Sequence, residues 1–95
     1  MKFEWDPEKN KINIEKHNVS FREAQTIFIN EYIETPDIDH SEEEERFIAL
    51  GVSAFKRELI VCYCYRTKVN NETIIRIFSA RKANKKERMD YYERR

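Results

Sequence analysis

Three apolar runs in the second half of the chain most strongly limit the folds it can adopt. The runs are "RFIALGVSAF", "ELIVCYCYR" and "TIIRIFSAR", and they are separated by short connections at Lys56–Arg57 and at "VNNE". Their apolar residues stand at alternate and sometimes at adjacent positions, which is typical of strands that are covered on much of both faces. Because short connections join antiparallel neighbours, the sequence predicts two consecutive β-hairpins in one sheet.

The residues before this sheet predict a short strand and two helices. "KFEW" is an extended lead-in or short strand, and Asp6 followed by Pro7 is typical of a helix start. This first helix is expected to reach about His17, with Asn18 as its left-handed terminator. The sequence "SFRE" is a capping box that opens a second helix, which is expected to end near Asn30. Its apolar face is predicted to contain Phe21, Ala24, Ile27 and Phe28.

The other segments predict a loop and a final helix. "EYIETPDIDHSEEEE" combines a proline with dense acid, and we interpret it as a loop with a brief strand at Tyr32–Glu34. Asn84 and Glu87 form a second capping box, which opens a helix that runs to the C-terminus. On this helix Met89 and Tyr92 are predicted to face the core.

These elements predict an α+β fold in a single domain over residues 1–95. We expect an antiparallel sheet of three main C-terminal strands and a short N-terminal strand, with two N-terminal helices and one C-terminal helix. With 95 residues the chain can bury one core, and its 13% aromatic content argues against disorder. No apolar run is long enough to span a membrane, and because "MKFEWDPEK" has no apolar h-region, secretion is not expected. Two cysteines in one strand, Cys62 and Cys64, fit free thiols in the cytoplasm.

The net charge of zero conceals a strong segregation of charge along the chain. Residues 31–45 carry eight acidic and no basic side chains, whereas residues 47–95 carry twelve basic and five acidic ones. A chain with an acidic loop and a basic half has a directional field, which suits an anionic partner. Solvated faces that merely differ in charge would fit the same pattern.

The arginines of the last predicted strand are candidates for binding phosphate. Strict alternation places Arg76, Phe78 and Ala80 on one face of the strand and Ile77, Ser79 and Arg81 on the other. The two arginines therefore face opposite ways unless a β-bulge intervenes. On the neighbouring strand Tyr63 and Tyr65 share one face, where either core packing or the stacking of RNA bases would explain them.

Such side chains have the chemistry needed for RNA cleavage by the 2′-hydroxyl. That reaction removes the 2′-hydroxyl proton, protonates the leaving 5′-oxygen and stabilises extra negative charge on the phosphate. Arginine suits the last task because its planar fork binds phosphate oxygens in pairs. His17 at a helix end is also explained by the helix dipole, and His40 is a candidate acid or base only if the acidic loop folds over the sheet. No metal site is predicted, because the cysteines and histidines lack the spacing of zinc ligands.

Three segments together resemble the BrnT toxin family of bacterial type II toxin–antitoxin systems. They are "FEWDPEKNKINIEKHNVSFREA", "SEEEERFIALGVS" and "RIFSARKANKKERMDYY", in the family's order and over nearly the whole chain. Lys9, Asn13, Lys16 and His17 match the N-terminal pattern and Arg46 the middle one. Two positions depart from it: Asn18 stands where the family commonly has Gly, and Phe78 where it has Ile.

The resemblance implies a RelE-like fold and a metal-independent, cofactor-free ribonuclease that blocks translation. It also implies a cognate BrnA-type antitoxin with a ribbon-helix-helix domain, so that contact with DNA would belong to the antitoxin. On this basis Arg76 and Arg81 are expected to stabilise charge, Glu87 to act as base or orienting group, and Tyr91 to stack or position the RNA. The predicted catalytic residues are Arg76, Arg81, Glu87 and Tyr91, and the predicted RNA-binding residues are Lys16, His17, Arg46, Tyr63, Tyr65 and Arg88.

Two other classes of function fit the same residues. A binding module would hold RNA or a protein partner on the basic face without turnover, and its affinity would depend on salt. A structural dimerisation domain would use the apolar face of the sheet together with Met89 and Tyr92 to bind a partner helix. It would expose a hydrophobic patch and would be indifferent to RNA.

Overall fold

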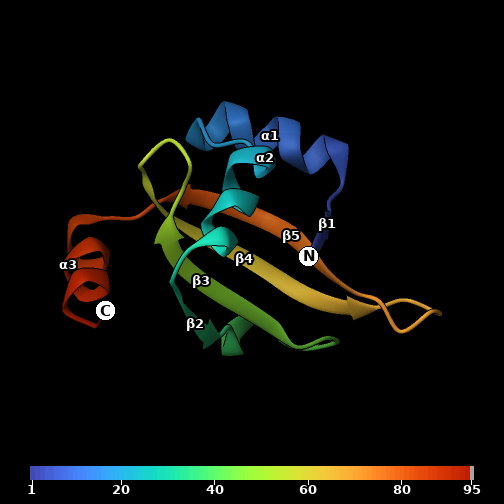
Figure 1. Ribbon diagram of the computed structural model, residues 1–95. Coiled ribbons are helices and arrows are strands. Elements are labelled where there is room, and N and C mark those ends of the chain that lie inside the picture. Colours follow the sequence, from blue (N-terminus) through green and yellow to red (C-terminus); the bar gives the residue numbers. More distant parts are fainter. Residues whose placement is uncertain (95) are drawn as a thin grey trace.

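The computed structural model describes residues 1–94 and is built around one five-stranded sheet in the order β1-β5-β4-β3-β2. Helices α1 and α2 lie over one side of the sheet, and helix α3 lies apart from them at one end (Figure 1). The strands are β1 (Lys2–Glu4), β2 (Tyr32–Pro36), β3 (Arg46–Val52), β4 (Glu58–Thr67) and β5 (Thr73–Lys82). The helices are α1 (Pro7–His17), α2 (Phe21–Ala24) and α3 (Lys85–Arg94), with 3₁₀ turns η1 (Gln25–Ile29) and η2 (Ile38–His40).

The sheet is mixed and has one strand more than predicted. β1 runs parallel to β5, pairing Phe3 with Ile75, whereas all the other neighbours are antiparallel. The brief strand predicted at Tyr32–Glu34 is present as β2, which extends to Pro36 and pairs with residues Phe47–Gly51 of β3. The α+β class is thus confirmed. The prediction of an antiparallel four-stranded sheet is wrong, because the sequence shows neither strand direction nor the pairing of the acid-rich β2.

The main core lies between the sheet and the helices on its first face. Gln25–Ile29 continues α2 as a 3₁₀ turn, so the second predicted helix ends as expected but changes its winding. The predicted apolar face is buried, which confirms that prediction: Phe21, Ala24, Ile27 and Phe28 pack with Ala49, Val61, Tyr63, Ile75 and Ile77. Gly51 lets η1 and β2 approach β3 closely, because a Cβ at position 51 would lie 3.1 Å from the Cβ atoms of Ile27 and Tyr32.

Helix ends follow the predicted capping signals. Asp6 accepts a hydrogen bond from the Glu8 amide, and Asn18 ends α1 with a φ of 57°. The capping box of α3 is complete, because Asn84 Oδ1 accepts from the Glu87 amide and Glu87 Oε1 accepts from the Asn84 amide, both at 2.8 Å.

Ser20 caps α2, but Glu23 does not complete that box. The Glu23 amide donates to Ser20 Oγ at 3.0 Å, whereas the Glu23 carboxylate turns to the β3–β4 turn. There it accepts from Ser53 Oγ at 2.7 Å and pairs with the guanidinium of Arg57. Burial alone would raise the pKa of Glu23, but the hydrogen bonds from Arg57 and Ser53 hold it below its ordinary value. This ion pair, with a buried carboxylate and a half-buried guanidinium, joins α2 to the turn between β3 and β4.

The buried side chain of Asn13 attaches α1 to the outer edge of β5. Its Nδ2 donates to the carbonyls of Val19 (2.8 Å) and Ala80 (2.7 Å), and its Oδ1 accepts from the Ala80 amide at 3.1 Å. The amide thus pairs with one strand residue as a neighbouring strand would.

Helix α3 packs against the opposite face of the sheet through Tyr91. Tyr91 is buried in a small cluster with Leu50 and Ala83, and its hydroxyl donates to the Glu31 carbonyl at 3.0 Å. Met89 and Tyr92 are 54% and 51% exposed. The prediction that these two residues face the core is wrong, because the helix turns a different side, centred on Tyr91, towards the sheet.

Candidate functional site

A β-bulge at Phe78 decides which residues of β5 share a face. β4 pairs Cys62 with Ser79 and Tyr63 with Ile77, so Phe78 is the extra residue between the two pairs. Residues that are paired across two strands point to the same side of the sheet. Because Cys64 pairs with Arg76 and Ile60 pairs with Arg81, the bulge brings both arginines to one face. This is the face opposite α1 and α2.

A pocket of about 380 Å³ lies on this face beside Arg46. Arg46 from β3 has its guanidinium carbon 4.0 Å from the centre of the Phe78 ring, and Lys9 from α1 has its Nζ 5.4 Å from the same centre. The buried Nε of Arg46 has no hydrogen-bond partner among residues 1–94. The lining residues are Lys9, Asp37, His40, Arg46, Ile48, Ile60, Cys62, Phe78, Ser79 and Arg81.

The two β5 arginines are held by carboxylates. Arg81 forms a two-fold pair with Glu87, with N–O distances of 2.8 and 2.9 Å. This pairing lowers the pKa of Glu87 despite the opposing effect of burial, so its carboxylate is ionised and already engaged. The geometry therefore favours the orienting role predicted for Glu87 over the role of a base. Arg76 pairs with Glu4 at 2.9 Å and does not line the pocket.

The acidic segment after β2 folds back beside Arg46. The Asp37 amide donates to the Arg46 carbonyl at 2.8 Å, and the Arg46 amide donates to Ser41 Oγ at 2.9 Å. Asp37 is buried, and its carboxylate accepts from His40 Nδ1 at 3.0 Å and from Cys62 Sγ at 3.3 Å. Burial would raise the pKa of Asp37, but these hydrogen bonds keep it below its ordinary value. The acidic loop thus folds over the sheet, which is the condition that His40 must meet to be a candidate acid or base.

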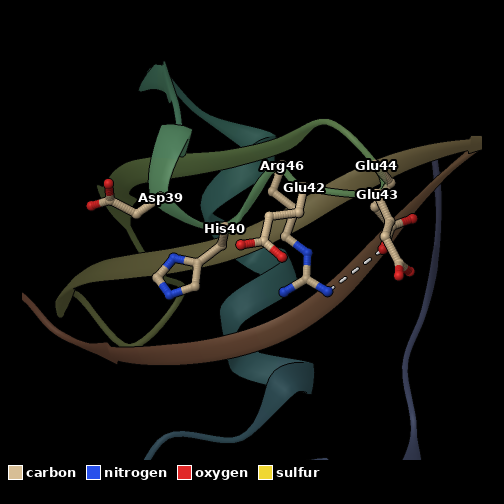
Figure 2. A pocket seen from close by; sticks show the side chains of 6 residues that line it. All are labelled: Asp39, His40, Glu42, Glu43, Glu44 and Arg46. Atoms are coloured by element: carbon tan, nitrogen blue, oxygen red, sulfur yellow. Dashed lines mark ion pairs between the residues drawn. The ribbon is translucent and has the colours of Figure 1, made fainter.

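Arg46 also borders a second pocket, whose other lining residues are mostly acidic. This pocket of about 290 Å³ is lined by Asp39, His40, Glu42, Glu43, Glu44 and Arg46. Figure 2 shows the ion pair between Arg46 and Glu44, while the Asp39 carboxylate points away from the guanidinium. Glu44 lies 3.6 Å from Arg46 and 3.4 Å from Arg66, so a phosphate that binds Arg46 competes with Glu44.

The predicted tyrosine platforms do not belong to the pocket. Tyr63 is fully buried on the helix-covered face, where its ring contacts Phe28 and its hydroxyl donates to Glu34. Tyr65 is 40% exposed on the same face and donates to the same carboxylate. Burial is the main cause that raises the pKa of both phenols, and the hydrogen bond to the Glu34 carboxylate is the second. The prediction that Tyr63 stacks on RNA is wrong, and so is the stacking role of the buried Tyr91, because neither ring is accessible.

The remaining predicted residues lie elsewhere on the surface. Lys16 and His17 are exposed at the end of α1 and do not line the pocket, and Arg88 donates to the Ala83 carbonyl at 2.9 Å. The structure therefore brings together Arg46 and Arg81 from the predicted set. It adds Lys9 and Asp37, which were not predicted as site residues. The spacing of Asp37 and His40, three apart in a tight turn, is the sequence signal that could have indicated their contact.

Two negative findings concern residues 1–94 alone. No group of three or more His, Cys, Asp or Glu side chains in this range is arranged to hold a metal ion. None of the helices in it combines the length and apolar character needed to cross a membrane.

Comparisons with known proteins give a consistent family assignment. A family model described as "Ribonuclease toxin, BrnT, of type II toxin-antitoxin system" matches residues 5–87. A crystal structure of the Brucella abortus ribonuclease toxin BrnT is similar in fold, with a TM-score of 0.60 and 23% sequence identity. The match covers 90% of this chain and 99% of that one. No curated protein matches the chain significantly.

Proposed function

The chain belongs to the BrnT family of ribonuclease toxins of type II toxin–antitoxin systems, and from this premise we propose that it is a metal-independent endoribonuclease that inhibits translation. We further propose that it acts in the cytoplasm as a single RelE-like domain. A cognate BrnA-type antitoxin with a ribbon-helix-helix domain would neutralise it and would supply any contact of the complex with DNA. The presence of an antitoxin partner follows from membership of a type II family.

The observation that carries this proposal is the cationic pocket on the open face of the sheet. Lys9, Arg46 and Arg81 come from three different elements and line one pocket of about 380 Å³. Lys9 has no carboxylate within ion-pair distance among the described residues, and the contact of Arg46 with Glu44 is long at 3.6 Å. Positive side chains with weak internal partners are available to phosphate oxygens. Arg81 also lines the pocket, and its two-fold pair with Glu87 fixes the orientation of its guanidinium.

Cleavage by the 2′-hydroxyl fits this arrangement of charge. In that reaction the RNA supplies its own nucleophile, and the protein positions the chain and stabilises the extra charge on the phosphorus. Arg46 and Arg81 are suited to the phosphate oxygens, because each guanidinium presents several N–H groups in one plane. The reaction requires no metal-bound water, since the attacking oxygen belongs to the substrate.

The test is cleavage of an end-labelled RNA, with and without ribosomes, by purified protein in the presence of EDTA. Arg46→Ala is expected to reduce the rate about 100-fold or more, as does the loss of one charge-stabilising donor in other enzymes. Arg94→Ala is the matched control, because Arg94 is exposed at the end of α3 and, within residues 1–94, pairs with Asp90 rather than with a pocket residue. Products with 2′,3′-cyclic phosphate and 5′-hydroxyl ends would support the proposal.

Two outcomes would contradict it. If the protein cleaves neither free nor ribosome-bound RNA but binds RNA through Arg46, it is a binding module without turnover. If cleavage stops in EDTA and returns with a divalent ion, the reaction depends on metal.

A further inference from the structure

We propose that His40 is the general base of the cleavage reaction and that the buried Asp37 positions it. This inference rests on the proposed ribonuclease function and assigns the proton transfer that the arginines cannot perform. Both residues come from the acidic segment, which the charge pattern alone would place away from RNA. In the structure, however, they line the same pocket as Lys9, Arg46 and Arg81.

The contact between Asp37 and His40 fixes which nitrogen of the ring carries the proton. His40 Nδ1 lies 3.0 Å from both carboxylate oxygens of Asp37. The carboxylate of Asp37 is ionised and can only accept, because its pKa is below its ordinary value. Nδ1 is therefore the donor in neutral His40, and the lone pair of Nε2 is left to take a proton. A base of this kind needs its ring held in one tautomer, which a buried carboxylate provides.

The position of Asp37 is itself fixed by three hydrogen bonds, two of them to neighbouring strands. Its amide is bonded to Arg46 of β3, its carboxylate accepts from Cys62 of β4, and its carbonyl accepts from Ser41 Oγ at 2.6 Å. The Cys62 thiol donates in this contact and remains neutral, since burial and the carboxylate raise its pKa to about 11. The exposed imidazole is thus mounted on an anchored turn next to the arginine that would bind the phosphate. The ionisable groups that border it are Lys9, Asp37, Asp39, Glu42, Glu43, Glu44, Arg46, Cys62 and Arg81.

The reaction balances without any further reactant except water. Nε2 of His40 takes the proton of the 2′-hydroxyl while the 2′-oxygen bonds to phosphorus and the bond from phosphorus to the 5′-oxygen breaks. The 5′-oxygen takes a proton from solvent water, and the imidazolium gives its proton to the hydroxide that remains. The products are a 2′,3′-cyclic phosphate and a 5′-hydroxyl, and His40 returns to its neutral form.

The experiment compares His40→Ala, Asp37→Asn and Asp39→Asn with the unaltered protein. His40→Ala is expected to lower the cleavage rate about 100-fold or more, within the range for general bases. Its affinity for an uncleavable 2′-O-methyl RNA should change less than about twofold, since the pocket cations hold the phosphate. Exogenous imidazole should restore cleavage to His40→Ala, above the rate of imidazole with RNA alone. A merely structural role of His40 would give no such rescue.

The two aspartate variants separate the loss of the hydrogen bond to His40 from the mere loss of a negative charge on the turn. Asp37→Asn should lower the rate at least about tenfold with unchanged binding, whereas Asp39→Asn, on the same turn and not bonded to His40, should behave as the unaltered protein. Circular dichroism checks that each variant is folded. Full cleavage by His40→Ala, or a loss that imidazole does not reverse, would overturn the assignment while leaving the ribonuclease proposal intact. Absence of cleavage by the unaltered protein, with and without ribosomes, would overturn both.

Discussion

At the scale of single residues, two buried polar side chains join the helices to the sheet. Asn13 bonds α1 to the edge of β5, and Glu23 bonds α2 to the turn between β3 and β4. Each replaces water with several hydrogen bonds, so that removing one partner leaves other buried groups unsatisfied. These residues are expected to contribute to stability rather than to chemistry, although Asn13 matches the family pattern.

Asn13→Ala is expected to lower the free energy of unfolding by about 2–4 kcal/mol, because it leaves the backbone groups of Ala80 and the Val19 carbonyl without partners. Urea denaturation followed by circular dichroism would measure the change. Asn30→Ala is the control, since Asn30 is exposed, and a shift below about 0.5 kcal/mol is expected there. Equal shifts in both variants would contradict the bridging role of Asn13.

Glu23 should make the free energy of unfolding depend on pH in the acidic range. Its pKa in the folded protein lies below the ordinary value of 4.5, so the unfolded chain binds its proton more tightly. The stabilisation by Glu23 is therefore complete above about pH 4.5 and is lost as the pH falls through the lower, folded-state pKa. Urea denaturation from about pH 6 to pH 3 should show a weaker decline in Glu23→Gln than in the exposed control Glu15→Gln. Parallel declines in the two variants would count against this linkage.

Sequence patterns predicted the residue-scale caps well and the buried faces less well. The signals at Asp6, Ser20 and Asn84 depend on local hydrogen bonds, which neighbouring residues determine. The burial of Tyr91 in place of Tyr92 depends on the side of α3 that meets the sheet, which spacing on one short helix does not determine. The sequence did not determine that His40 lines the same pocket as Arg46 and Arg81, because this depends on where the acidic segment lies.

At the scale of elements, the bulge in β5 and the path of the acidic segment create the pocket. Strict alternation would separate Arg76 from Arg81, and the extra residue Phe78 brings them to one face. The sequence allowed a bulge but contained no signal for its position. Similarly, the sequence predicted strands at the positions of all five, from long runs for β3, β4 and β5 and from short segments for β1 and β2. It did not predict the pairing of β1 and β2 at the edges of the sheet, because that pairing depends on long-range contacts that local patterns do not encode.

The packing of η1 on β3 predicts the effect of a substitution at Gly51. A methyl group at Gly51 would lie 3.1 Å from the Cβ atoms of Ile27 and Tyr32, which is closer than ordinary van der Waals contact. Gly51→Ala is therefore expected to lower the free energy of unfolding by about 1–3 kcal/mol, and Gly51→Val by more. Thermal denaturation of both variants would test this, and an unchanged midpoint in Gly51→Val would show that η1 moves aside freely.

At the scale of the whole molecule, equal numbers of opposite charges are arranged so that acid and base meet at one pocket. The acidic segment supplies Asp37 to this pocket and Glu44 beside it, where Glu44 pairs with Arg46. The cations are Arg46 at the start of β3, Arg81 from the basic half and Lys9 from α1. When RNA binds, Arg46 would exchange its contact with Glu44 for contacts with a phosphate group. A net charge of zero is therefore compatible with binding a polyanion, since the local field and not the sum determines it.

The number of pocket cations predicts how RNA binding depends on salt. With three phosphate contacts, the logarithm of the affinity for single-stranded 2′-O-methyl RNA should fall against the logarithm of salt with a slope of about −2. Arg46→Ala should make the slope shallower by about 0.7, and Arg94→Ala should leave it unchanged. Fluorescence anisotropy over a salt series would measure these slopes. Identical slopes for all three proteins would place the RNA elsewhere on the surface.

The side-chain amide of Asn13 also has a consequence for how copies of this chain meet. β1 covers β5 only at Ile74–Arg76, so the outer side of β5 would otherwise offer free backbone groups near Ala80. Such a border is where a second chain adds its own strand and starts an aggregate. Asn13 occupies it from within the molecule, and Pro36, which lacks an amide hydrogen, ends the strand at the opposite border. Both borders of the sheet therefore present fewer free backbone groups to an incoming strand, which lowers the tendency of two copies to join their sheets.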